Sequence, residues 1–347
     1  MSSALRASRP ARTRVPASAG APDLSGFAGG PGPSGSAAGP ELSGSAGAPD
    51  LPCFAGGRGL SGFTGAAGPP GSAGGPQPAG RAVGPELPGS AGGPELAGRA
   101  VVVLHAHPDD EAIFTAATMR RLADRGARVI LVMATGGELG ERLAPLRPGE
   151  TVHRRRLAEL EDAAEVLGVS RLVLLGRRDS GMVGWPSARH PRALARGRTD
   201  RLARRLAEVI DAERADTVLH YDDRGIYGHP DHVAVHRIGA LAAAMTGAVS
   251  YEATVDRDHL HRRGGTHLID AASGHTGDYG RAGHEIPVRL TATDAELAAK
   301  RAAMAAHASQ IAPAAVGGDG FADTYRHEWY LTSHARGLLT DLAATPN

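Results

Sequence analysis

The chain has 347 residues, and its 38 basic and 37 acidic side chains leave a formal net charge of +1. This balance gives no overall field that would draw the protein onto nucleic acid or a membrane, and no stretch approaches the ~20 apolar residues that span a bilayer. The single cysteine, Cys53, excludes an internal disulfide framework and a cysteine zinc cage. Any metal must therefore be held by His, Asp or Glu.

Residues 1–98 repeat short phrases rich in Gly, Pro, Ala and Ser. "GAPDLSGFAGG" returns as "GAPDLPCFAGG", and "GPEL" recurs. Because large apolar side chains are too few to offset the entropy of ordering this segment, we predict a disordered tail, either a docking arm or a solvated extension. The first residues are basic but lack the apolar core of a secretion signal, which favours a cytoplasmic location.

From Arg99 onward, apolar runs alternate with amphipathic segments. The expected elements, in chain order, are a strand at 99–107, a helix at 111–126, a strand at 127–135, a helix at 151–169, a strand at 171–176, a helix at 199–215, a strand at 216–221, a helix at 229–245 and a strand at 248–254. Buried strands that alternate with helices predict one α/β domain over 99–347, a doubly wound, mostly parallel Rossmann-like sheet with helices on both faces.

The turn after the first strand carries ionisable residues instead of glycines. A dinucleotide-binding sheet has G-x-G-x-x-G there, whereas this chain has "HAHPDD", with His107 at the strand exit. A second turn of the same design, "HPDH" from His229 to His232, follows the strand at 216–221. If the two strands are neighbours, the turns face each other across the crevice where such sheets bind ligands.

Three histidines and three aspartates would then share a partly buried site. A single H-P-D turn is more often a helix cap than a metal site, but two copies at equivalent strand ends favour a bound divalent cation, which offsets the buried charge. These ligands suit zinc, with iron(II), manganese or cobalt as alternatives. We expect His105 to pack or to support the site, His236 to support it or face solvent, and Glu111 to begin a helix and contact a ligand histidine.

Four motifs resemble a known family. "AHPDDE", "DSGM", "GHPDH" and "AHASQ", spread over residues 100–335, are similar to motifs of the PIG-L/LmbE-like zinc-dependent N-acetylglucosamine deacetylases. "RDSGM" and "YGHPDH" are most similar to the actinobacterial branch that contains the mycothiol-pathway deacetylase and the mycothiol-conjugate amidase. The resemblance implies a Zn²⁺ enzyme that removes an acetyl group from an amino sugar by activating water.

The resemblance also implies a role for each site residue. The metal ligands would be His107, Asp110 and His232. Asp109 would be the general base for the attacking water, and His229 would stabilise the oxyanion. Asp231 would hold the orientation of His229, and Tyr227 would stand beside the same carbonyl.

Substrate contacts follow from the same resemblance. Arg156 and Asp179 would contact sugar hydroxyls, although Arg156 also suits a solvated helix face. Glu138, in "TGGELG", is a further candidate contact, and Trp185 would either stack on a sugar ring or pack in the core. The Gly- and His-rich stretch 256–284 has no clear periodicity and is a candidate lid.

Several rival functions remain open. Within the same chemistry, the chain could be an amidase for mycothiol-like conjugates or a deacylase of a glycosylated natural product. A non-catalytic metal- and sugar-binding protein is disfavoured because it would not need Asp109, and a nicotinamide-dependent oxidoreductase is disfavoured because the glycine fingerprint is missing. The expected partner is a small-molecule amino sugar, with neither nucleic acid nor membrane, and the sequence predicts no oligomeric state.

Overall fold

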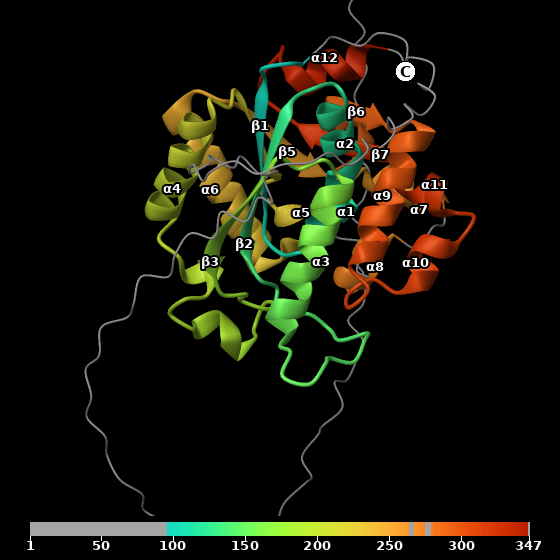
Figure 1. The fold of residues 1–347 in the computed structure, drawn as a ribbon. Coiled ribbons are helices and arrows are strands. Elements are labelled where there is room, and N and C mark those ends of the chain that lie inside the picture. Colours follow the sequence, from blue (N-terminus) through green and yellow to red (C-terminus); the bar gives the residue numbers. More distant parts are fainter. Residues whose placement is uncertain (1–95, 264–266, 275–278, 346–347) are drawn as a thin grey trace, which may run out of the picture. The chain divides into compact units, whose positions relative to one another are not determined.

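The computed structural model describes residues 96–263, 267–274 and 279–345 (Figure 1). Residues 1–95 of the predicted tail lie outside this range. Leu96 was predicted to belong to the tail, but it is buried, and its N–H donates a hydrogen bond to the carbonyl of Arg125 at 2.9 Å. The folded domain therefore includes at least three residues before the predicted boundary at residue 99.

The described strands form one mixed sheet of the predicted α/β class. They are β1 (Ala100–His105), β2 (Arg128–Thr135), β3 (Arg171–Arg177), β4 (Thr217–Tyr221), β5 (Val249–Thr254), β6 (Val288–Thr291) and β7 (His327–Leu331). Their order is β3-β2-β1-β4-β5-β7-β6, and β1 pairs in parallel with both β2 and β4. Every residue of β1 is buried, as expected of a central parallel strand covered on both faces.

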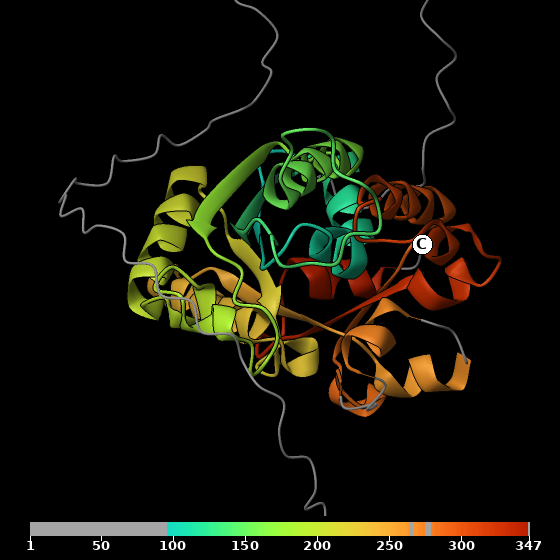
Figure 2. The same ribbon diagram turned by 90° about the horizontal axis from the view of Figure 1, so that it is seen from below.

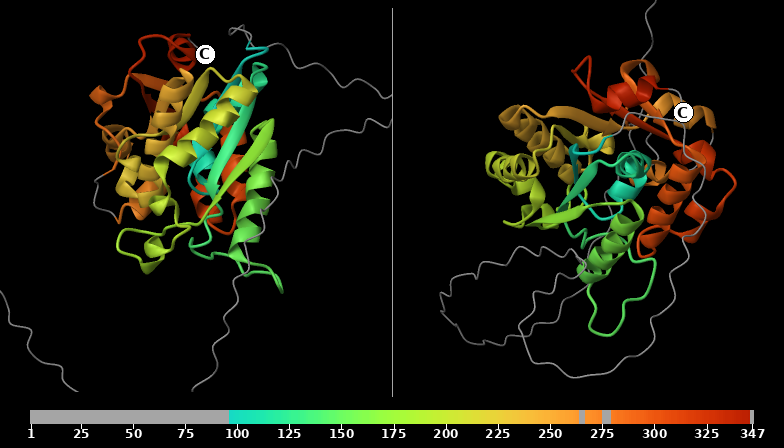
Figure 3. Two further views of the ribbon diagram at one scale, coloured as in Figure 1. Left: turned by 90° about the vertical axis from the view of Figure 1, so that its left-hand side faces the viewer. Right: turned by 45° about the horizontal axis from the view of Figure 1, so that its top comes forward.

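Helices cover both faces of the sheet. The described α-helices are α1 (Asp110–Phe114), α2 (Ala116–Asp124), α3 (Val152–Val166), α4 (Thr199–Glu213), α5 (Gly225–Gly228), α6 (Pro230–Thr246), α7 (Arg257–Arg263), α8 (Leu268–Ala272), α9 (Asp294–Ala306), α10 (Pro313–Gly317), α11 (Phe321–Tyr325) and α12 (Leu338–Ala344). Figure 2 shows α2, α3 and α9 on one face and α4 and α6 on the other, and the left view of Figure 3 looks onto α4 and α6. No described helix is long and apolar enough to cross a bilayer.

The prediction of one continuous helix over 111–126 was wrong, because the chain breaks at Thr115. This residue has a non-helical φ of −136°. Its hydroxyl donates to the carbonyl of Glu111 at 3.3 Å, and its Oγ1 lies 2.8 Å from His105 Nε2. A threonine side chain bonded in this way competes with the helical backbone, so α1 ends and α2 begins on either side of it.

The C-terminal part of the sheet was not predicted. β7 pairs antiparallel with β5, and β6 pairs antiparallel with β7, so two antiparallel strands extend the parallel part. The parallel strand order reverses between β1 and β4, and both H-P-D turns follow these two strands. This is the topological switch point at which doubly wound sheets bind ligands.

Candidate active site

The two H-P-D turns meet beyond the ends of β1 and β4. The ring centroid of His107, in the first turn, lies 4.6 Å from that of His229 and 5.4 Å from that of His232 in the second. His229 caps the N-terminus of α6, because its Nδ1 accepts a hydrogen bond from the N–H of Asp231 at 3.1 Å. Pro230 occupies the first turn of α6, where a residue without an N–H is tolerated.

Asp110 lies between two of these histidines. Its Oδ2 is 3.3 Å from Nδ1 of His107 and 3.3 Å from Nε2 of His232. Both ring nitrogens of His232 are buried and have no hydrogen-bond partner among the described residues. Two atoms that bind one zinc ion tetrahedrally at ~2.0–2.1 Å lie about 3.3 Å apart. The spacing and the unpartnered imidazole therefore fit a shared divalent cation.

The two groups of side chains that meet the spacing for a metal site in the described part of the chain differ from the predicted set of His107, Asp110 and His232. One consists of His107, His229 and His232, and the other of His107, Asp179 and Asp231, with ligand atoms within 4.8 Å of one another in each. Although burial lowers the pKa of His107, the carboxylates of Asp179, Asp110 and Asp231 raise it well above its usual value. The same field of carboxylates attracts a cation.

Asp109 is held in an unusual backbone conformation. Its φ is 114°, which only glycine adopts easily. Its N–H donates to Oε2 of Glu111 at 3.0 Å, and its Oδ2 accepts a hydrogen bond from Arg156 at 3.1 Å. Burial raises the pKa of the Asp109 carboxyl to about 6, although Arg156 acts in the opposite direction. Such a carboxyl can accept a proton near neutral pH.

A buried pair between Glu111 and His307 supports this conformation. His307 Nε2 lies 2.5 Å from Oε1 of Glu111, and neither side chain is exposed. The histidine that contacts Glu111 is thus His307, in "AHASQ", and not one of the predicted ligands. The sequence contained the motif but gave no sign of this contact, because the two residues are 196 positions apart.

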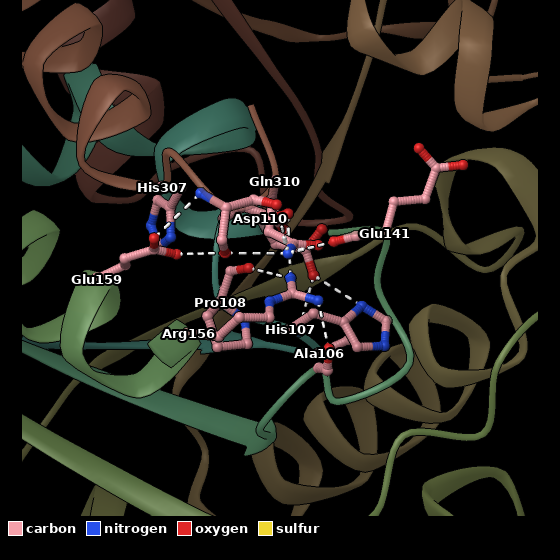
Figure 4. Close-up of polar contacts among 12 residues, drawn as sticks. Ala106, His107, Pro108, Asp110, Glu141, Arg156, Glu159, His307 and Gln310 are labelled. Carbon is pink, nitrogen blue, oxygen red and sulfur yellow. Dashed lines mark hydrogen bonds and ion pairs between the residues drawn. The ribbon is translucent and has the colours of Figure 1, made fainter. Parts of the chain in front are cut away.

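Arg156 is buried at the site rather than on a solvated helix face. Its guanidinium donates to the carbonyl of Gly137 at 2.5 Å, to the carbonyl of Pro108 and to Asp109. Figure 4 shows it pointing from α3 toward the turn that carries His107. These bonds tie α3 to the turn, so Arg156 orients Asp109 as well as lining the pocket.

The contacts of Asp231 differ from the predicted arrangement. Its Oδ2 accepts a hydrogen bond from the N–H of Ser180 at 2.9 Å and lies 3.3 Å from Nε2 of His107. It is the backbone N–H of Asp231 that contacts His229. Because Nδ1 of His229 accepts this bond, a neutral His229 carries its proton on Nε2. Burial, with the neighbouring His107 and His232, lowers the pKa of His229 to about 2, so the ring stays neutral.

Tyr227 stands beside these histidines, 5.0 Å from His232 and 6.0 Å from His229 between ring centroids. It follows Ile226, whose φ of 62° is outside the helical region. The buried carboxylate of Asp222 accepts the N–H of Ile226 at 2.8 Å. This bond holds the strained turn that presents Tyr227 to the site.

A pocket of about 330 Å³, here called the polar pocket, opens beside these residues. Asp179 and Trp185 line it, and Trp185 is 46% exposed, which rules out the core-packing alternative. Glu138 is not part of the lining, and its Oε1 accepts the N–H of Asp179 at 3.3 Å. Arg156 and Asp179 therefore both line the polar pocket, whereas Glu138 contacts the backbone of Asp179 and does not line it.

The remaining histidines have supporting contacts. Both nitrogens of His105 lie 2.8 Å from a hydroxyl, that of Tyr221 and that of Thr115, an arrangement in keeping with the expected packing or supporting role. His236 Nδ1 lies 3.0 Å from the carbonyl of Tyr221. In the candidate lid over 256–284, α7 and α8 are described, whereas 264–266 and 275–278 lie outside the described residues; the lid stays a prediction.

Comparison with known proteins identifies the family. The PIG-L family model, described as GlcNAc-PI de-N-acetylase, matches residues 102–243. A 1D-myo-inositol 2-acetamido-2-deoxy-alpha-D-glucopyranoside deacetylase from Nakamurella multipartita is 40% identical over 234 residues, which cover 61% of this chain and 79% of the relative. This chain belongs to the PIG-L family.

Other relatives agree with this assignment. A protein of the same name from Acidothermus cellulolyticus is 39% identical over 236 residues, 62% of this chain and 80% of that protein. Among solved structures, the N,N'-diacetylchitobiose deacetylase from Pyrococcus horikoshii aligns with a TM-score of 0.44 at 20% identity, over 67% of this chain and 83% of that one. The family model and the two named deacetylase relatives confirm the predicted family resemblance.

Proposed function

We propose that this chain is a metal-dependent hydrolase that removes the acetyl group from an N-acetylglucosamine-type amino sugar. The observation that carries the proposal is the position of Asp110, 3.3 Å from a nitrogen of both His107 and His232, in a chain whose relatives are named deacetylases. Asp109 beside this cluster favours catalysis over mere binding. Zinc as the native metal and a cytoplasmic location belong to the same proposal.

His107, Asp110 and His232 would hold a divalent cation, which when bound polarises the amide carbonyl and makes a water molecule easier to deprotonate. We favour this set over the two other groups because Nδ1 of His229 already accepts the N–H of Asp231, and Oδ2 of Asp231 already accepts the N–H of Ser180. The carboxylate of Asp179 already accepts the N–H groups of Gly181 and Leu139, and its remaining lone pairs would accept hydrogen bonds from sugar hydroxyls, together with contacts from Arg156.

Asp109 transfers protons in the proposed reaction, whereas His229 and Tyr227 stabilise the oxyanion. Asp109 accepts the proton of the attacking water and returns it to the amine nitrogen of the sugar as the C–N bond breaks. His229 stays neutral and donates a hydrogen bond from Nε2 to the developing oxyanion, with the Tyr227 hydroxyl beside the same oxygen. Acetate and the free amino sugar are the products, so atoms and charge balance.

The first test of the function is a comparison of amides. We expect full-length protein to release free amine from 1D-myo-inositol 2-acetamido-2-deoxy-alpha-D-glucopyranoside at least on the order of 10²-fold faster than from a simple N-acetylated amine, because polar groups built for hydroxyls reject analogues without them. Asp179→Asn should raise KM for the sugar more than for the simple amine. Equal rates on both amides would contradict the substrate class, while leaving the hydrolytic chemistry intact.

The Glu111–His307 pair provides a second test, of how Asp109 is positioned. Glu111→Ala removes the acceptor of the Asp109 N–H, and we expect kcat to fall roughly 10- to 100-fold, the usual scale for groups that support a site, with KM nearly unchanged. Glu111→Gln keeps an acceptor and should restore part of kcat.

Glu159→Ala is the matched control for this test. Glu159 is also a buried carboxylate that bonds the segment after α9, at Ser309, but it does not touch Asp109. The Glu159→Ala variant should lose thermal stability but should not show the selective fall in kcat that we expect of Glu111→Ala. Equal kcat losses in both alanine variants would reduce the role of Glu111 to stability.

A further inference from the structure

A second pocket, of about 180 Å³, lies against the same carboxylates as the polar pocket. The two pockets share Asp109, Asp110, Tyr227, Ala272 and Gln310 in their linings. Asp109 and Tyr227 are the residues that face the reacting amide in the proposed function. The candidate active site therefore borders two adjoining spaces.

The second pocket, here called the apolar pocket, has a different lining. Its apolar side chains belong to α1, α8 and the segment after α9, and they are Ile113, Phe114, Leu268, Ile269 and Ile311. Charged and polar groups such as Arg156, Asp179 and His229 line only the polar pocket. Sugar hydroxyls need hydrogen-bond partners, so the amino sugar fits the polar pocket and not the apolar one.

The apolar wall is anchored in the fold. α8 begins at His267, a buried side chain whose Nδ1 accepts the N–H of Ile269 at 3.1 Å. The N–H of Leu268 donates to the hydroxyl of Tyr325 at 3.1 Å, and the His267 ring lies 6.5 Å from that of Phe114 between centroids. Two of the wall's elements, α1 and α8, are thus packed together through His267.

An amide has two substituents that lead away from its carbonyl carbon in different directions. With the carbonyl at Asp109 and Tyr227 and the sugar amine in the polar pocket, the acyl group is left to enter the apolar pocket. We propose, on the basis of the proposed function, that the apolar pocket is an acyl-chain subsite and that the enzyme hydrolyses amino sugars whose N-acyl chain is longer than acetyl.

The size of the pocket sets the chain length. A cavity of about 150 Å³ lined by aliphatic and aromatic side chains holds a six-carbon ring. An acetyl methyl group, about the ~30 Å³ of a water molecule, would leave most of the 180 Å³ unfilled. A straight chain of roughly four to six carbons fills it, and each added methylene that leaves water favours the bound state.

The test is a chain-length series on the full-length, metal-loaded protein. N-acetyl, N-butanoyl, N-hexanoyl and N-decanoyl derivatives of glucosaminyl-inositol are compared by release of free amine. We expect kcat/KM to rise about fourfold per methylene up to roughly six carbons and to fall for decanoyl, as burial of each methylene predicts. A steady fall from acetyl onward would overturn the subsite and leave the deacetylase proposal standing. Absence of hydrolysis with every derivative would overturn both.

A substitution that fills the apolar pocket provides a second test. It compares kcat/KM for the hexanoyl substrate with kcat/KM for the acetyl substrate in the same variant, so a general loss of activity does not affect the result. Ile269→Trp places an indole in the apolar pocket and should lower the hexanoyl-to-acetyl ratio of kcat/KM at least tenfold. Met245→Trp, on the exposed side of α6, adds a similar bulk elsewhere and should leave the ratio unchanged. An unchanged ratio in Ile269→Trp would place the acyl chain outside this pocket.

Discussion

His232→Ala is expected to lose most of its bound divalent metal and to lower turnover by at least about 10³-fold. Nε2 of His232 faces Asp110 at 3.3 Å in a fully buried position, and no other described side chain bonds either nitrogen. A metal ion acting as a Lewis acid lowers the activation free energy by several kcal/mol. Each ~1.4 kcal/mol of that stabilisation that is lost lowers the rate tenfold. Metal content per chain, measured after gel filtration, checks the first part.

His236→Ala is the control for this substitution. His236 lies one turn further along α6 and contacts the carbonyl of Tyr221, but not the metal-ligand cluster. We expect it to keep its metal and most of its turnover. If His232→Ala held as much metal as the unsubstituted protein, His232 would have to be removed from the ligand set.

Asp109→Asn is expected to keep the metal and to lose about 10²- to 10⁴-fold in kcat, the usual scale for a general base. The amide retains the size of the carboxyl and can still accept a hydrogen bond from Arg156, so binding should change little. Asp110→Asn, one residue further on, should instead lose metal. Normal turnover in Asp109→Asn would end the assignment of Asp109 as the base.

The sequence predicted the features that depend on neighbours along the chain. The apolar run of β1, the helix predicted over 151–169 and the two H-P-D turns are local patterns, and parallel topology then brings the turns together. The meeting of the two turns was predicted on the condition that their strands are neighbours, and β1 does pair with β4 in the sheet.

Contacts between distant segments could not be predicted in this way. Glu111 meets His307 only because α9 packs against α1 and α2, and Asp231 turns its carboxylate to Ser180 because the loop after β3 reaches the site. The break at Thr115 depends on a hydroxyl that His105 holds from another element. The apolar pocket needs α8, a five-residue helix without a recognisable period in the sequence.

We expect hydrolysis to depend on a cation held by the two H-P-D turns. The most direct measurement is amine release from 1D-myo-inositol 2-acetamido-2-deoxy-alpha-D-glucopyranoside by protein stripped with a chelator, then titrated with Zn²⁺, Fe²⁺, Mn²⁺ or Co²⁺. We predict that stripped protein is inactive and that activity returns in proportion to metal, reaching its maximum at one ion per chain. Full activity in protein shown to be free of metal would contradict the account.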